Sequence, residues 1–154
     1  MTEFLSLDVL AASIPNGAHV AIPPDYSGVA MAATWVLIRR GAKVLRLLSV
    51  PTAGLQADLL IGAGCVAEIE TAGIALGEAG SAPRFVAALK AGALAVKDTT
   101  CPAIHAALQA AEKGIPFIPL RGIIGSDLVG RCPDWRVAEN PFADGGCGGG
   151  ECSQ

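Results

Sequence analysis

The sequence predicts an α/β fold, built as an open, mostly parallel sheet flanked by helices. Short apolar segments alternate with longer segments of helical character, and glycine or proline separates most of them. Strands that alternate with helices are joined by crossovers, and crossovers of this kind produce parallel sheets. The chain is also 52% hydrophobic and only 16% charged, which is more apolar than an average soluble domain. This excess indicates a sheet buried on both faces and is compatible with a subunit interface.

The N-terminal region predicts a helix, a strand and a second helix. Residues 7–12 form the first helix, and Ser6 is placed to cap its first turn. Residues 18–22 form the first strand, which two consecutive prolines end. Residues 29–40 predict a helix that is apolar on nearly all sides. It carries arginines in its last turn and has Gly41 just past its end.

Two buried strands are predicted next, over residues 44–50 and 58–61. The second is an apolar run closed by Gly62 and Gly64, as expected for a buried strand that ends in a tight turn. Glycine can adopt a positive φ or let a ligand come close, and ligands usually bind at turns after the carboxyl ends of parallel strands. We therefore expect Gly62 and Gly64 to contact a ligand, with Cys65 lining the same cleft. The alternative is a buried strand that ends in glycine and binds nothing.

The second half of the chain continues the alternation. A helix over residues 83–91 begins with a proline in its first turn. A short strand follows at residues 94–96, and a helix runs from about residue 100 to residue 113. The last predicted strand, residues 117–120, is framed by prolines. These elements complete a sheet of the α/β class.

Length and composition predict one domain over residues 1–142 and a disordered tail over residues 143–154. The tail is rich in glycine and contains Cys147 and Cys152, and it has no pattern for a strand or a helix. Two cysteines are too few for a metal site and no histidine lies nearby, so we expect no metal there.

Charge and targeting signals exclude several classes of partner. The net charge is −3 and Lys/Arg residues form no cluster, which argues against nucleic acid or an anionic membrane as partner. No segment reaches the about 18 consecutive apolar residues of a membrane-spanning helix. Glu3 and Asp8 stand where a basic leader would lie, so we expect no signal peptide and a cytoplasmic location. The five cysteines are odd in number and scattered, which favours thiols over disulfides.

A series of short motifs occurs in one order along almost the whole chain. The motifs are Asp58-Leu59-Leu60-Ile61-Gly62-Ala63-Gly64-Cys65-Val66, Leu76-Gly77-Glu78, Ala82-Pro83-Arg84-Phe85, Leu108-Gln109-Ala110-Ala111, Pro116-Phe117-Ile118-Pro119-Leu120-Arg121-Gly122 and Gly125-Ser126-Asp127-Leu128. This series resembles the alpha (A-type) subunit of family I CoA-transferases, of the glutaconate and 3-oxoacid type, over residues 7–142. The resemblance implies the CoA-transferase fold, a member of the ribose-phosphate isomerase and glucosamine-phosphate deaminase superfold. The family continues past this point, so the fold is expected to be incomplete at the C-terminus. A truncated or frame-altered copy is the preferred explanation, and a natural short form is the alternative.

The resemblance also implies a function. Family I CoA-transferases work by ping-pong chemistry through a glutamate that becomes a CoA thioester, and in two-subunit members this glutamate lies on the beta subunit. The chain is therefore expected to act with a beta-type partner, with coenzyme A as cosubstrate and no bound cofactor. One alternative is a hydrolase component that opens a CoA-linked ring, and another is a non-catalytic remnant or assembly module. The acyl group is not indicated. Glu68, Glu70 and Glu78 are assigned structural roles rather than nucleophilic ones.

The first strand-to-helix turn departs from the glycine-rich turn of the resembled family. It reads Pro-Pro-Asp-Tyr and then Ser27 and Gly28. A helix N-terminus attracts anions, so Ser27 and Gly28 are candidate ligand contacts. The two prolines remove backbone donors from this turn. Ser27 as an ordinary helix cap is the alternative.

Cys101 stands at a predicted helix start, where the helix dipole lowers a thiol pKa. His105 follows four residues later on the same helix face, and a Cys–His pair is the minimum for an activated nucleophile. The alternatives are a small apolar filler for Cys101 and a surface hydrogen-bonding role for His105.

Arg121 and Gly122 lie in the segment that resembles the family's loop near the active site. Arg121 is the only charge in residues 115–126, so we expect a carboxylate, backbone carbonyls or a ligand anion to satisfy it. The turns at Ser27, Gly62 and Cys101 are expected to converge on one cleft. The high apolar content and the missing terminal sheet elements also predict a chain that is unstable or self-associates when it is alone.

Overall fold

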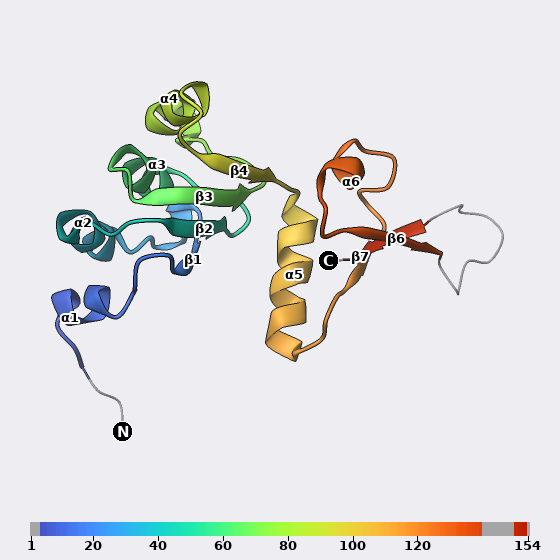
Figure 1. The fold of residues 1–154 in the computed structure, drawn as a ribbon, viewed down its shortest axis with the longest axis horizontal. Coiled ribbons are helices and arrows are strands. Elements are labelled where there is room, and N and C mark those ends of the chain that lie inside the picture. The colour runs from blue at the N-terminus through green and yellow to red at the C-terminus, as the bar shows by residue number, and fades with distance from the viewer. Residues whose placement is uncertain (1–3, 140–149, 154) are drawn as a thin grey trace. The chain divides into compact units, whose positions relative to one another are not determined.

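The computed structural model describes residues 4–139 and 150–153, and the chain divides into two compact units. Unit 1 comprises Met1–Lys97 and unit 2 comprises Asp98–Gln154. The predicted domain over residues 1–142 stays a prediction. The elements of both units are labelled in Figure 1.

Unit 1 contains the α/β part of the fold. Its helices are α1 (Leu7–Ala12), α2 (Met31–Arg40), α3 (Leu55–Gly62) and α4 (Pro83–Lys90), with short 3-10 turns at Asp25–Ser27 and Gly77–Ala79. Its strands are β1 (His19–Ile22), β2 (Leu45–Ser49), β3 (Val66–Thr71) and β4 (Ala95–Asp98). They form one sheet in the order β1-β2-β3-β4, in which β1 pairs with β2 and β2 with β3 in parallel. The arrows of β2, β3 and β4 point the same way in Figure 1. The predicted open, parallel sheet flanked by helices is confirmed.

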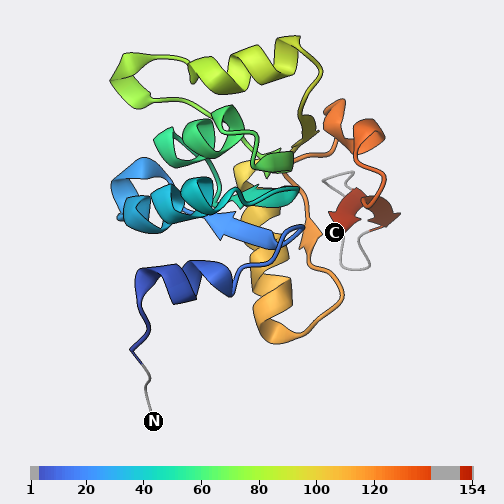
Figure 2. The ribbon, with the colours of Figure 1, turned by 60° about the vertical axis from the view of Figure 1, so that its left-hand side comes forward.

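The two faces of this sheet differ in chemistry. Alternate residues such as Leu45, Leu47 and Ile69 are buried in one apolar core together with residues of the helices, and Figure 2 shows these strands and helices from a second direction. The opposite face carries two cross-strand ion pairs, from Arg46 to Glu68 at 3.3 Å and from Lys97 to Glu70 at 3.3 Å. This alternation differs from the expected sheet with two apolar faces.

The predicted strand at residues 58–61 is wrong, because these residues belong to helix α3. The helix is buried on nearly all sides, and its apolar run therefore lacks the polar face that marks most helices. A short apolar run of this kind has no periodicity that separates a buried helix from a buried strand. The strand follows the Gly62–Gly64 turn instead, as β3, which the sequence did not predict.

Local signals located several helix ends correctly. The Ser6 side chain accepts a hydrogen bond from the Val9 backbone N–H at 3.3 Å, so the predicted cap of α1 is confirmed. Gly41 ends α2 with a φ of 72°, the left-handed conformation that glycine adopts most easily. Thr100 caps the helix of unit 2 by accepting from the Ala103 backbone N–H at 3.3 Å.

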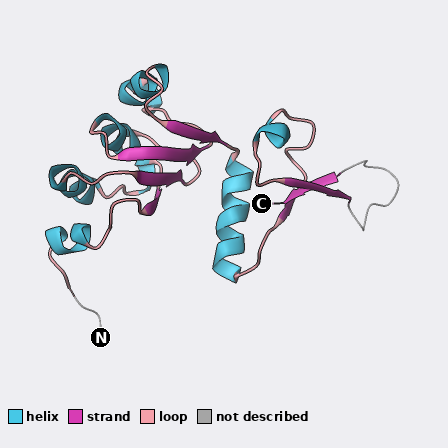
Figure 3. Cartoon of the chain, in the orientation of Figure 1, coloured by secondary structure: helices cyan, strands magenta, loops and turns pink. Residues whose placement is uncertain are grey.

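Unit 2 has its own small sheet and core. Its elements are α5 (Cys101–Lys113), β5 (Pro119–Leu120), α6 (Leu128–Arg131), β6 (Arg136–Glu139) and β7 (Gly150–Ser153). The strand order is β5-β7-β6 with antiparallel pairing, and the strands are magenta in Figure 3. Ala103, Ile123, Cys132 and Trp135 form its buried apolar cluster.

Strand β7 lies within the segment for which the sequence predicted no strand. The rest of the predicted tail, which includes Cys147, is outside the described residues. No helix in the described ranges has the length and apolar character to cross a membrane.

Candidate functional site

A pocket of about 490 Å³ opens where β1, β2 and β3 reach their carboxyl ends. Three loops line it, one after each of these strands. The lining residues are Pro24, Asp25 and Tyr26 after β1, Thr52, Ala53 and Gly54 after β2, and Gly73, Ile74, Ala75, Leu76 and Gly77 after β3. Ligands of open α/β sheets bind in the crevice outside the carboxyl ends of the strands. This pocket is therefore the candidate site in unit 1.

Backbone hydrogen bonds extend the pairing of β2 and β3 into the pocket wall. Ala53 donates its N–H to the carbonyl of Gly73 at 3.0 Å, and Ala75 donates to the carbonyl of Ala53 at 3.1 Å. Ala53 and Ile74 form a parallel bridge at the same place. The two loops are thus held side by side as a continuation of the sheet.

A buried hydroxyl pair anchors these loops to the ends of the strands. Ser49, the last residue of β2, donates from its hydroxyl to the Pro51 carbonyl at 2.7 Å and lies 2.6 Å from the hydroxyl of Thr71. Thr71, the last residue of β3, accepts a hydrogen bond from the Gly73 N–H at 3.0 Å. Both side chains are buried, so water competes little for these bonds. These hydrogen bonds therefore hold the pocket wall in place without a ligand.

The Asp25 side chain links the loop after β1 to the start of α3. Its Oδ2 accepts a hydrogen bond from the Leu55 backbone N–H at 2.8 Å. The N-cap position of α3 is Gly54, which has no side chain to cap the helix, and a Cβ there would overlap the Asp25 carboxylate. Asp25 therefore acts as a cap supplied from another segment, and it is a charged residue on the pocket wall.

Asp58 plays a similar part for the next helix. It is fully buried, and its Oδ1 accepts from the backbone N–H groups of Arg84 at 2.8 Å and Phe85 at 2.9 Å. Its Oδ2 forms an ion pair with the Arg84 guanidinium at 2.9 Å. Helix α4 begins with Ala82 and Pro83, neither of which caps it with a side chain, so Asp58 satisfies its first N–H groups.

Gly62, Gly64 and Cys65 lie at the amino end of β3, whereas the pocket lies at its carboxyl end. The expected convergence of the Gly62 turn with the Ser27 turn is therefore wrong. The group that comes close to Gly62 is the Arg84 side chain, which a Cβ at Gly62 would overlap. Gly64 has a φ of 66°, a left-handed conformation that glycine adopts without steric cost. Cys65 is buried, and burial raises the pKa of its thiol, an effect that the nearby Lys43 charge partly offsets.

Ser27 and Gly28 follow the pocket residues Asp25 and Tyr26 directly. Ser27 ends a 3-10 turn and Gly28 has a φ of 72°. The N-cap of α2 is Ala30, so Ser27 is not the cap of that helix. Pocket-lining residues of this turn are Pro24, Asp25 and Tyr26. The sequence pattern did not single them out.

A second pocket, of about 220 Å³, lies within unit 2. Its lining comes from the start of α5, through Thr100 and Pro102, and from the Leu120, Gly122 and Ile123 segment. Gly122 thus lines the same pocket as Thr100 and Pro102, the two neighbours of Cys101 in the chain.

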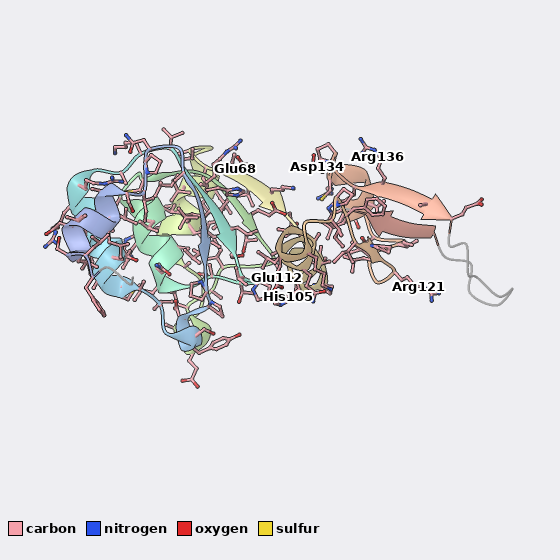
Figure 4. All side chains as sticks on the ribbon, turned by 90° about the horizontal axis from the view of Figure 1, so that it is seen from below. Glu68, His105, Glu112, Arg121, Asp134 and Arg136 are labelled. Atoms are coloured by element: carbon pink, nitrogen blue, oxygen red, sulfur yellow. The ribbon has the colours of Figure 1, made fainter. Side chains whose placement is uncertain are left out.

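The charged and nucleophilic residues near this second pocket are exposed. Cys101 is exposed in the first turn of α5, and His105 is exposed one turn later. Within the described ranges no hydrogen bond joins these two side chains, and their role as a pair stays a prediction. Arg121 is exposed, and Figure 4 shows its side chain directed away from the ribbon. A carboxylate, backbone carbonyls or a ligand anion as the partner of Arg121 stays a prediction. Across residues 4–139, no cluster of three or more His, Cys, Asp or Glu side chains is arranged to hold a metal ion.

Comparisons with known proteins find similarity to CoA-transferases and to a decarboxylase. No family model matches the sequence. The A-type subunit of the 3-oxoadipate CoA-transferase of Pseudomonas knackmussii is 31% identical over 146 residues, which cover 92% of this chain and 51% of that protein. A crystal structure of a variant of the decarboxylase AibA/AibB matches with a TM-score of 0.81 and 28% identity, over 97% of this chain and 56% of that one. Glutaconate coenzyme A-transferase from Acidaminococcus fermentans shares the fold, with a TM-score of 0.82 and 23% identity over 97% of this chain and 51% of that one. The chain thus spans about half the length of the relatives it matches.

Proposed function

Since the chain resembles the A-type subunits of family I CoA-transferases in sequence and in fold, we propose that it works as the A-type part of a two-component CoA-transferase. The reaction would move CoA from an acyl-CoA to a carboxylic acid. The observation that carries this proposal is the 31% identity to an A-type CoA-transferase component along 92% of the chain. The same likeness supports a cytoplasmic location and a beta-type partner.

The pocket of unit 1 fits this role. It lies where an α/β sheet places its ligands, and most of its lining is apolar or uncharged, which suits an acyl or pantetheine segment. No glutamate is among the described residues that line it. Glu68 and Glu70 are engaged in ion pairs with Arg46 and Lys97. These facts support the proposal that the glutamate nucleophile comes from the partner polypeptide.

Co-expression with the product of the adjacent reading frame tests the proposal. A tag on this chain would be used to purify the complex, which is then mixed with an acyl-CoA and a panel of carboxylic acids. We expect new acyl-CoA thioesters to form, and hydroxylamine to trap an activated glutamate on the partner polypeptide. A stable complex that forms no new thioester with any acid would contradict the transferase proposal.

A decarboxylase is the second candidate, because the structure at 28% identity is described as one. The same purified complex distinguishes the candidates by product. A transferase needs the acceptor acid, a ring-opening or thioester hydrolase releases product without an acceptor, and a decarboxylase releases CO₂ with the thioester intact. A chain that recruits no partner and yields none of these products is the non-catalytic remnant.

A further inference from the structure

Hydrogen-bond donors on the wall of the unit 1 pocket point to a residue that selects the acyl group. We propose that Tyr26 is a specificity residue, whose hydroxyl donates a hydrogen bond to an oxygen atom on the acyl chain of a bound CoA thioester. That oxygen belongs to a carbonyl group or to a carboxylate beyond the thioester group. This inference rests on the proposed function, because it concerns how the same site recognises its acyl group.

The backbone donors of the pocket wall are the first argument, because several of them are already used within the protein. The N–H groups of Ala53, Gly73, Ala75 and Leu76 donate to acceptors of unit 1 at 2.8 to 3.1 Å. Pro24 also lines the pocket, and proline has no backbone N–H. These residues therefore offer a ligand oxygen no free backbone donor, and the side-chain donors of the wall gain importance.

Two side chains of the wall can donate a hydrogen bond. Tyr26 and Thr52 carry hydroxyl groups, and among the described lining residues there is no lysine, arginine or histidine. The remaining polar side chain is that of Asp25, which when ionised is only an acceptor and already accepts the Leu55 N–H at 2.8 Å. The side-chain donors available to an oxygen of the acyl chain are therefore the two hydroxyls.

Of these two hydroxyls, that of Tyr26 is the better placed. The Tyr26 residue is 87% exposed, whereas Thr52 is half-buried. Within the described part of the chain no protein group accepts a hydrogen bond from the Tyr26 hydroxyl. A phenol is also more acidic than an aliphatic alcohol and so donates a stronger hydrogen bond. An aromatic ring with a polar tip suits a ligand that is apolar along its chain and carries an oxygen acceptor.

A ring that merely covers the pocket mouth is the competing explanation, and the Tyr26→Phe variant separates the two. This variant keeps the ring and removes only the hydroxyl. Because the side chain is exposed, the change should leave the free energy of unfolding within about 0.5 kcal/mol of wild type. If the ring only covers the mouth, phenylalanine serves equally well and the selectivity for an acyl-chain oxygen stays unchanged.

The experiment measures binding of thioether analogues of CoA thioesters to the co-expressed complex by calorimetry. S-(3-oxobutyl)-CoA carries a carbonyl group, S-(3-carboxypropyl)-CoA carries a carboxylate, and S-butyl-CoA carries neither. A thioether cannot transfer its side chain, so the measured affinities report binding alone. The affinity ratio of each oxygen-bearing analogue to S-butyl-CoA isolates the recognition of that oxygen.

We expect Tyr26→Phe to lower at least one of the two ratios by about three- to ten-fold, the order of one net hydrogen bond. The affinity for S-butyl-CoA should stay unchanged, which would show that the pocket is intact. The analogue whose ratio falls identifies the recognised oxygen as a carbonyl or a carboxylate oxygen. Thr52→Val is the matched variant, because it removes the other hydroxyl of the pocket wall and keeps the shape of the side chain.

The other outcomes also decide the matter. If no complex forms, or if none of the analogues binds to it, the proposed function of this site fails and the inference fails with it. If the analogues bind and both ratios are the same in wild type and Tyr26→Phe, the inference alone fails. If Thr52→Val lowers a ratio and Tyr26→Phe does not, Thr52 is the donor and the role of Tyr26 is overturned. An equal loss of affinity for all the analogues in Tyr26→Phe would also overturn it, because the hydroxyl would then select no acyl group.

Discussion

Asp58 on α3 contacts Arg84 at the start of α4 twice, through the backbone N–H at 2.8 Å and through the guanidinium at 2.9 Å. One buried carboxylate therefore joins two helices that are adjacent in the fold but separated by β3 in the chain. The guanidinium itself is half-exposed, so most of the stabilisation comes from the backbone donors that Asp58 satisfies.

Asp58→Ala should lower the free energy of unfolding by about 2 to 4 kcal/mol, because it leaves the part-buried N–H groups of Arg84 and Phe85 without an acceptor. Urea denaturation followed by circular dichroism measures the change. Asp127→Ala is the control, since the Asp127–Arg131 pair is exposed and spans 3.7 Å. That variant should stay within about 0.5 kcal/mol of wild type. Equal losses in both variants would contradict the capping role of Asp58.

Gly62→Ala should destabilise the wild-type chain, because the new methyl group would overlap the Arg84 side chain. Arg84 can move away, so we expect a cost of about 1 kcal/mol that includes part of its ion pair with Asp58. In an Arg84→Ala background the same change should be neutral or stabilising, because alanine is a better helix former than glycine by about 1 kcal/mol. A double-mutant cycle measures this change of sign. If the sign does not change, the cost of Gly62→Ala does not come from overlap with Arg84.

Cys101 should react with iodoacetamide faster than Cys132 and Cys65, since Cys101 is exposed at a helix start and the other two thiols are buried. Peptide mass mapping after a brief exposure measures the three rates. His105→Ala should slow the Cys101 reaction if the two residues act as a pair. An unchanged rate would leave Cys101 as a solvent-exposed thiol without activation by His105.

The raised pKa of Cys65 predicts a loss of stability in alkali. Burial favours its neutral thiol in the folded state, so the thiolate forms first in the unfolded chain, near the ordinary pKa of 9.0. The stabilising contribution of the neutral Cys65 thiol is present below that pH. It is lost as the pH rises through the pKa that the thiol has in the folded state. Wild type should thus lose more unfolding free energy between about pH 8 and pH 10 than Cys65→Ala. Parallel denaturant titrations of the two proteins measure the difference, and identical slopes would contradict it.

Sequence reasoning succeeded where the signal was local. Ser6 and Gly41 each mark a helix end through a side chain or a backbone conformation within four residues. It failed at residues 58–61, where a helix buried on nearly all sides has the same apolar pattern as a buried strand. That single error placed the predicted ligand site at the wrong edge of the sheet. The Gly62 turn was taken as the carboxyl end of a strand, whereas it precedes the start of β3.

The pocket itself depended on contacts that no local pattern shows. Asp25 reaches Leu55 across 30 positions, and Ser49 reaches Thr71 across 22. The rule that ligands bind after the carboxyl ends of strands selected the turn after β1, and three residues of that turn line the pocket. The loops after β2 and β3 could not be assigned to the same site from the sequence, because that assignment requires the order of helix α3 and strand β3.

The capping of α4 by Asp58 has a consequence for the order in which unit 1 opens and closes. Helix α4 has no side-chain cap of its own, and its first amides depend on a carboxylate that α3 holds in place. The two helices therefore form one cooperative segment, and the N-terminal turn of α4 is protected only while α3 is docked. Hydrogen exchange at the amides of Arg84 and Phe85 would then report the opening of both helices together.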